Sequence, residues 1–208
     1  MQAIAKIWRA ARVSTFGFLA DNQALAATEF AVIVPLMLVM FFGTVEFSSA
    51  VAIDRKVTLI ARTLSDLTSQ SSGSVTDSAL QNAFTASISI VTPYDATPVK
   101  ATISEIYISS ANVATVQWSK AATITSGATQ ATLTASSRNA GDIVTTMIPS
   151  SLLVAQTYLI LSEVSYLYTP SVGYVLKSGV TMSDVSYTRP RQVSCVTYNN
   201  VPSGCPTP

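Results

Sequence analysis

Residues 24–45 read ALAATEFAVIVPLMLVMFFGTV, and positions 30–45 carry no charged side chain. With the two alanines before it and residues 47–53 after it, the apolar stretch exceeds the roughly 20 residues that a helix needs to cross a bilayer. Two carboxylates lie at its margins, Glu29 near the start and Glu46 near the end. A carboxylate costs about 2.5–3.5 kcal/mol at the bilayer centre and less toward its edges. The sequence therefore predicts one transmembrane segment, at about residues 30–51.

The charges on the two sides of this segment bear on its orientation. The preceding part contains Lys6, Arg9 and Arg12 against Asp21 alone, which favours a cytoplasmic N-terminus. The far side is also cationic, so the charge asymmetry does not decide the orientation by itself. Its cations are Arg55, Lys56 and Arg62, offset by Asp54 and Asp66.

Three interpretations of the apolar segment compete. It can be a plain signal anchor that stays uncut. It can be a secretory signal peptide, because the small-x-small sequence of residues 50–52, AVA, follows it. Against that interpretation, the run is longer than the usual 7–15 residues, and Glu46 interrupts the approach to the site. The third interpretation places a cleavage site before the apolar run.

The composition excludes several functions. The 208 residues include 12 Lys and Arg and 11 Asp and Glu, so the net charge is +1 and no basic surface is available for nucleic acid. Histidine is absent, which removes the commonest general base and the commonest metal ligand. The acids are scattered singly, with no pair at the spacing of a catalytic dyad. We therefore predict no catalytic residue, no metal site and no cofactor.

The cysteines are Cys195 and Cys205, both close to the C-terminus. Two cysteines without histidine or further thiols do not form a zinc site. In an oxidising compartment they would form a local disulfide, and two separate thiols are the alternative. A disulfide places the C-terminal part of the chain outside the cytoplasm.

The region after the apolar run predicts an α+β fold. Apolar residues recur at the helical period over residues 57–67, so one helix is expected from about Leu25 to about Ser69, kinked or loosened at Pro35. Residues 70–74 are a linker, and Asp77 caps a short helix. Strands are expected at 101–109, 113–120, 154–168 and 180–187, the last being the final strand. Both faces of residues 154–168 are apolar, so we expect the long helix to cover one face and another layer or a partner to cover the other. The helical stripe comprises Val57, Ile60, Ala61, Leu64 and Leu67.

The residues around the apolar run resemble the N-terminus of TadE-like minor pilins (pseudopilins) of the tight-adherence (Tad) secretion system. The resemblance rests on the sequence from Ala24 to Phe30 and on Pro35. Three later landmarks follow in family order: QWS at 117–119, EVSYLYTP at 163–170 and SYTRPR at 186–191.

The resemblance implies a cytoplasmic leader at residues 1–24 that a prepilin peptidase removes between Ala24 and Leu25. The family usually has glycine where this chain has Ala24. Glu29 and Phe30 then become assembly residues, with the Glu29 carboxylate pairing with the N-terminal ammonium of a neighbouring subunit. An acid in the first turn also meets the positive end of the helix dipole, worth about 0.3–1 kcal/mol.

We therefore expect a non-enzymatic minor pilin that initiates, tips or anchors a Tad-type filament for surface adhesion. Residues 25–69 would be its N-terminal helix, with the transmembrane segment at about 30–51, and residues 70–208 its α+β head, periplasmic or extracellular, with a C-terminal disulfide loop. Expected partners are the other minor pilins, the major pilin, the prepilin peptidase, the inner-membrane assembly platform and membrane lipid, but no nucleic acid. The alternative is a secreted or anchored adhesin-like domain unrelated to filaments; a hydrolase is disfavoured by the missing histidines.

Overall fold

The structure is a computed structural model of the chain, and it describes residues 22–170, 179–200 and 205. Most of the predicted leader, with Lys6, Arg9 and Arg12, lies outside the described residues. The chain divides into two compact units: residues 1–47 with 171–177, and residues 48–170 with 178–208. Each unit is described by itself.

Helix α2, Asn22–Ser69, runs from the first unit into the second. Pro35 lies inside it, and helical structure is assigned on both sides of this proline. In the second unit α2 has a clear core face, because residues at helical spacing are buried while Arg55 and Arg62 between them are exposed. Leu67, predicted to belong to that face, is instead 38% exposed. The buried apolar residues are Ile53, Val57, Ile60, Ala61 and Leu64.

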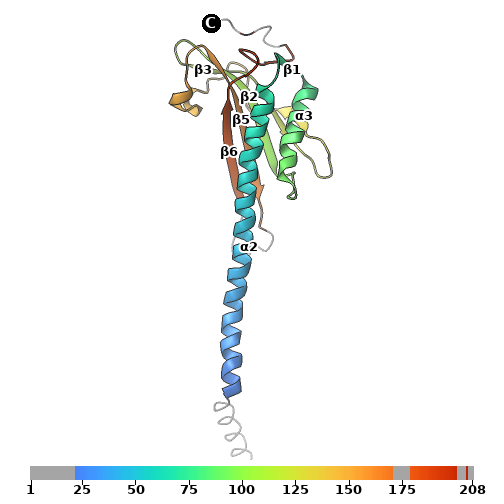
Figure 1. Cartoon of the computed structure of the whole chain (residues 1–208), viewed down its shortest axis with the longest axis vertical. Helices are drawn as coiled ribbons and strands as arrows, with labels where there is room; N and C mark the ends of the chain where they lie inside the picture. The colour runs from blue at the N-terminus through green and yellow to red at the C-terminus, as the bar shows by residue number, and fades with distance from the viewer. Residues whose placement is uncertain (1–21, 171–178, 201–204, 206–208) are drawn as a thin grey trace, which may run out of the picture. The chain divides into compact units, whose positions relative to one another are not determined.

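A five-stranded antiparallel sheet packs against this part of α2, which confirms the predicted α+β class (Figure 1). The strand order is β4-β3-β2-β5-β6. The predicted hairpin is present as β2 and β3, and the predicted long strand is β5, an interior strand paired with β2 and β6. The bounds are β2 Val99–Ile108, β3 Ala114–Thr123, β4 Thr132–Ala135, β5 Thr157–Tyr168 and β6 Val180–Thr188.

The two faces of the sheet have separate cores. On the helix side, Ile160 and Val164 of β5 pack with α2 and with α3, Asp77–Ile88. On the far side, Leu159 and Leu161 pack with Val144 and other residues of the connection between β4 and β5. That connection contains two short 3₁₀ helices, η2 at Thr145–Met147 and η3 at Ser150–Leu152. The second covering layer predicted from the apolar faces of β5 is therefore supplied by the chain itself.

A β-bulge in β3 places Trp118 in the helix-side core. Glu105 pairs with Trp118 and the next residue, Ile106, pairs with Val116, so Gln117 is the extra residue. Val116 before the bulge packs in the far-side core, whereas Trp118 after it packs in the helix-side core. The inserted residue shifts the alternation of the strand, so the side chains that follow it point to the opposite face of the sheet.

Short elements close the head. Helix α3 is capped by Thr76, whose hydroxyl accepts a hydrogen bond from the Ala79 N–H, so the predicted cap at Asp77 is off by one residue. A one-turn 3₁₀ helix, η1 at Ser89–Val91, follows α3. Strand β6 is not the final strand, because β7 at Thr197–Tyr198 pairs in parallel with β1 at Ser74–Val75. The predicted linker therefore ends in a strand.

Helix α2 is also tied to the end of the α3 segment by a lysine. The Lys56 ammonium donates hydrogen bonds to the Ile90 and Thr92 carbonyl oxygens, at 2.8 and 2.7 Å. Ile90 lies within η1 and Thr92 directly follows it, in the last turn, where carbonyl groups lack a helical N–H partner. Lys56 therefore has a structural role in the head, although the sequence suggests only a flanking charge.

Candidate functional site

The first part of α2 is an apolar helix whose side chains lie largely exposed in the chain. Phe30 is 69% exposed and Val32 75% exposed. From Ala26 onward the helix is long and apolar enough to cross a membrane, with a mean hydropathy of 2.2 in its most apolar window. Soluble monomers rarely expose a contiguous apolar surface of this kind. The helix therefore suggests membrane anchoring. Other exposed residues of this surface are Ile33, Leu36, Met37, Leu38, Val39, Met40, Phe41, Val45 and Phe47.

The predicted cleavage and assembly residues lie on consecutive turns at the start of this helix. Ala24 and Leu25 are helical, because α2 begins at Asn22. Glu29 and Phe30 are exposed. Residues 25 and 29 are four positions apart, so a terminal ammonium at Leu25 would lie one turn before the Glu29 carboxylate. Within the described chain, Glu29 is the only carboxylate at the N-terminal margin of the apolar helix.

Glu46, at the other margin, has a different environment. It is 3% exposed, while its neighbour Phe47 is 70% exposed. The protein itself therefore buries the second carboxylate of the apolar run. Sequence reasoning placed both acids at a lipid margin, and only Glu29 keeps that exposed position.

The head contains a buried carboxyl group that the sequence analysis missed. Glu105 is 1% exposed; it accepts hydrogen bonds from the Val196 backbone N–H at 2.5 Å and from the Trp118 indole N–H at 3.1 Å. The same indole N–H donates to the Val196 carbonyl oxygen at 2.6 Å. Burial raises the pKa of Glu105 to about 8, although both hydrogen bonds act in the opposite direction. The contacts fix the C-terminal tail against the sheet. The sequence ATISEIYI at 101–108 contains a signal for the burial of Glu105. Alternate residues of a strand face the same side of the sheet, so Glu105 lies on the same face as Ala101 and Ile103.

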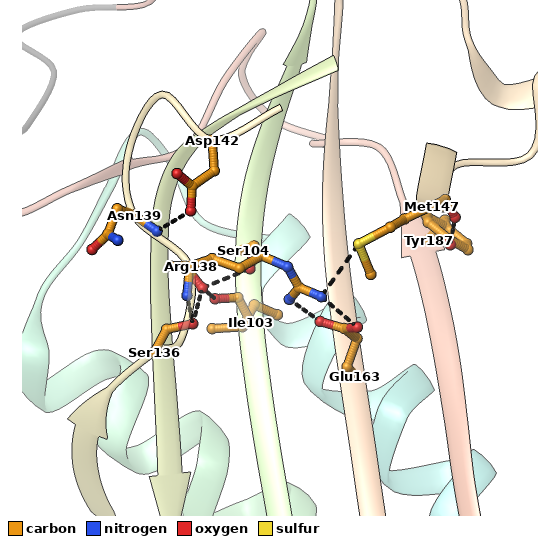
Figure 2. Close-up of polar contacts among 10 residues, drawn as sticks. Ile103, Ser104, Ser136, Arg138, Asn139, Asp142, Met147, Glu163 and Tyr187 are labelled. Atoms are coloured by element: carbon orange, nitrogen blue, oxygen red, sulfur yellow. Dashed lines mark hydrogen bonds and ion pairs between the residues drawn. The ribbon is translucent and has the colours of Figure 1, made fainter. Parts of the chain in front are cut away.

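An arginine fastens the far-side covering segment to the sheet. The Arg138 guanidinium binds both carboxylate oxygens of Glu163, with 2.7 Å between Nη2 and Oε1 (Figure 2). Its Nη2 also lies 3.5 Å from the Met147 sulfur, and the Tyr187 hydroxyl donates to the Met147 carbonyl at 2.7 Å. Glu163 raises the pKa of Arg138 through the hydrogen bond. The charges of Arg138 and Glu163 neutralise each other, so we assign this pair a structural role.

The cysteines close a loop at the tail. Cys195 and Cys205 are joined, with their Cα atoms 5.7 Å apart. Cys195 is buried beside Val196, the residue that Glu105 and Trp118 hold. The predicted pairing is thus compatible with the fold, and its formation in the cell stays a prediction. Across residues 22–170, 179–200 and 205, no group of three or more Cys, Asp or Glu is placed to hold a metal ion.

Comparison with known proteins gives one family. Residues 25–63 match the model of the family described as TadE-like protein. This confirms the predicted resemblance over the helix segment, and the match begins at the residue that the sequence analysis places after the cleavage site. No curated protein and no solved structure matches the chain.

Proposed function

We propose that the chain is a minor pilin of a Tad-type pilus, without enzymatic activity, which assembles through the exposed apolar part of α2. The observation that carries this proposal is a largely exposed apolar helix with Glu29 at its start, within the segment that matches the TadE-like family. An apolar surface of this kind suits both lipid and a bundle of like helices.

In this proposal a prepilin peptidase cuts between Ala24 and Leu25, and the mature chain waits in the inner membrane with its head in the periplasm. Other minor pilins, the major pilin and the assembly platform are its partners. The subunit then initiates, tips or anchors the filament. By joining the filament it becomes part of the extracellular pilus.

The proposed chemistry of assembly is charge neutralisation in an apolar bundle. A free ammonium at Leu25 and the Glu29 carboxylate are each costly to bury alone, but they can pair between neighbouring subunits. Loss of one partner of a buried ion pair costs about 3–5 kcal/mol because the other charge is left uncompensated. That corresponds to a factor of roughly a hundred or more in the assembly equilibrium.

The test is co-purification of the full-length chain with the other pilins from detergent extracts of its native host. The variants are Glu29→Gln, which removes the charge, and Glu29→Asp, which keeps it. We expect Glu29→Gln to reach the membrane and be cleaved, yet to lose at least tenfold of the co-purified pilins, while Glu29→Asp retains most of them.

A plain membrane anchor gives the opposite result. Removing an acid from an apolar segment would leave membrane retention unchanged or improved. Normal complexes with Glu29→Gln would therefore refute the assembly role of this carboxylate, and the absence of any associated pilin in the wild type would refute the proposed function.

A further inference from the structure

The second part of α2 carries an exposed stripe on the side away from the core. It is formed by Val51, Arg55, Leu59 and Arg62, at successive spacings of four, four and three residues, and we call it the outer stripe. Leu59 is 50% exposed and Val51 is 36% exposed. These spacings place the four side chains on one helical face, opposite Val57 and Leu64 of the core. Two aliphatic residues thus alternate with two arginines.

The two arginines of the outer stripe have no carboxylate partner within the described chain. The ion pairs among its described residues are Arg138 with Glu163 and Arg191 with Asp66. Two acids lie near the arginines on this part of the helix. Asp66 is engaged by Arg191, and Asp54, although adjacent to Arg55 in sequence, forms no ion pair with either arginine of the outer stripe. Arg55 and Arg62 are seven residues apart, which puts their Cα atoms about 10.5 Å apart along the helix axis.

We propose that the outer stripe docks against a helix of a partner pilin that carries two carboxylates seven residues apart with an aliphatic residue between them. This inference rests on the proposed function and names the partner's chemistry. Leu59 lies between the two arginines, so it would pack on the partner's aliphatic residue while the flanking charges pair. Charges at the margin of a helix–helix contact select the partner and its register more than they add affinity.

Anionic lipid is the other chemistry that a mixed cationic and apolar stripe could meet. From Val51 to Arg62 the outer stripe extends about 16 Å along the helix. The headgroup layer of one leaflet is only about 5–8 Å thick, so a crossing helix meets it with about one turn. Val51 lies at the end of the predicted transmembrane segment, so Arg55 lies about 6 Å and Arg62 about 16 Å beyond it along the helix. A single headgroup layer therefore reaches Arg55 but not Arg62, whereas a second helix can contact both.

The experiment places a photo-cross-linking amino acid at position 59 of the full chain in its native host. A matched position is Val185 of β6, which is 42% exposed and far from the outer stripe in sequence. Cross-linked peptides are identified by mass spectrometry. We expect position 59, and not position 185, to cross-link to a pilin helix with carboxylates seven residues apart.

Charge reversal then tests the chemistry. The Arg55→Glu, Arg62→Glu double variant should reduce the position 59 cross-link about tenfold. The control is Lys100→Glu, Arg189→Glu, which makes the same change in net charge at two other exposed positions. Changing the two identified carboxylates of the partner to lysine should restore the cross-link to the reversed variant.

Three outcomes would overturn the inference: cross-links to lipid alone, cross-links to a segment without paired carboxylates, or a yield that charge reversal leaves unchanged. Absence of any cross-link at position 59 would do the same. The Glu29 experiment separates this failure from that of the proposed function. If Glu29→Gln still loses the pilins while position 59 gives no cross-link, the pilin role stands and the outer stripe does not take part.

Discussion

Glu105 is the residue whose environment differs most from that of an ordinary carboxyl group. Both of its oxygens accept N–H groups, yet burial dominates and raises its pKa from 4.5 to about 8. The folded state therefore holds the proton more tightly than the unfolded state does. Stability from this group is fully present below about pH 4.5 and is lost as the pH rises toward 8.

We therefore predict that the free energy of unfolding of the head falls between pH 5 and 8, by at most ~1.4 kcal/mol per pH unit. Denaturant titration of the full chain in detergent, followed by tryptophan fluorescence, measures it. Glu105→Gln should abolish this fall. The glutamine amide has an NH₂ group in place of one carboxyl oxygen, so this donor would face the N–H of Trp118 or Val196 and that hydrogen bond would be lost. The loss lowers the free energy of unfolding at every pH by about 1–3 kcal/mol. The same pH dependence in both proteins would exclude Glu105 as its origin.

Ala24 carries the prediction about processing. If the peptide bond between Ala24 and Leu25 is cut, the mature chain begins at Leu25, and Ala24→Leu leaves the precursor intact because the site requires a small residue. Ala24→Gly, which restores the family's usual residue, should be cut at least as well as the wild type. N-terminal sequencing decides among the three interpretations. A chain beginning at Ile53 would indicate a signal peptide, and one beginning at Met1 a plain anchor.

At the residue scale, sequence reasoning selects residues by local pattern. It selects Glu29, Phe30 and the cysteine pair from their neighbours in sequence, and the roles assigned to them stay predictions. It missed Glu105 and Arg138 as structural residues, because their partners, Val196 and Glu163, are 91 and 25 residues away. Sequence reasoning also treated Glu46 and Glu29 alike, although Glu46 is buried and Glu29 is exposed. Burial by distant segments has no signature in a local window.

At the scale of elements, the covering segment between β4 and β5 depends on the Arg138–Glu163 pair. Both side chains are mostly shielded, at 17% and 23% exposure, so the pair is less screened than a surface pair. The contrast is Arg191 with Asp66, at 58% and 39% exposure. The first pair should hold its segment, and the second should contribute little.

We predict that Arg138→Ala destabilises the head by about 1–3 kcal/mol and that a double-mutant cycle with Glu163→Gln gives a coupling of about 0.5–3 kcal/mol. The matched cycle of Arg191→Ala with Asp66→Asn should give less than about 1 kcal/mol. Thermal or denaturant unfolding of the full chain measures both. Equal couplings in the two cycles would contradict the assignment of Arg138 as the fastening residue.

The tail is a second element with its own prediction. If Cys195 and Cys205 are joined in the cell, the closed loop is worth ~2–3 kcal/mol in the chain-entropy model. The tail has further attachments, because Trp118 binds Val196 and the Thr197 N–H donates to the Gly73 carbonyl. Reduction should therefore loosen the tail without unfolding the sheet.

Hydrogen exchange measures this difference. The Thr197 and Asn199 amides should exchange faster after reduction, while those of β2 and β5 stay protected. The Cys195→Ser, Cys205→Ser variant should behave like the reduced wild type without any reductant. Two thiols that react with a maleimide in the denatured, unreduced protein would show that the bond does not form.

The elements also show where pattern reading reaches its limit. The long helix and α3 were predictable because their apolar residues recur at the helical period. The strands β2, β3, β5 and β6 were predictable because they are long runs rich in β-branched and aromatic residues. The short strands β1, β4 and β7 were not, since two to four residues have no period and acquire their structure from their partners. The bulge at Gln117 was equally invisible, because it is defined by the pairing of two strands.

At the scale of the whole molecule, the remaining question is on which side of the membrane the head lies. Basic residues flank the apolar helix on both sides, so the positive-inside rule alone is indecisive. The Lys56 ammonium binds two backbone carbonyls in the folded head. One of the cations on the C-terminal side is therefore explained by the fold of the head and says nothing about orientation. If Cys195 and Cys205 are joined in the cell, the head lies outside the reducing cytosol, because disulfides persist in oxidising compartments. A cytoplasmic N-terminus and an exported head are therefore what we predict.

We predict that a cysteine in the head is reached by a membrane-impermeant maleimide from outside the cell, and that one near the N-terminus is not. In a Cys195→Ser, Cys205→Ser background, Ser126→Cys provides an exposed head position. Gln2→Cys, combined with Ala24→Leu so that the leader is retained, provides the other. In spheroplasts Ser126→Cys should be labelled, whereas Gln2→Cys should require detergent, because the reagent carries a charge that cannot cross the hydrocarbon core. The reverse pattern would place the head in the cytoplasm, where neither disulfide formation nor assembly of an external filament could follow.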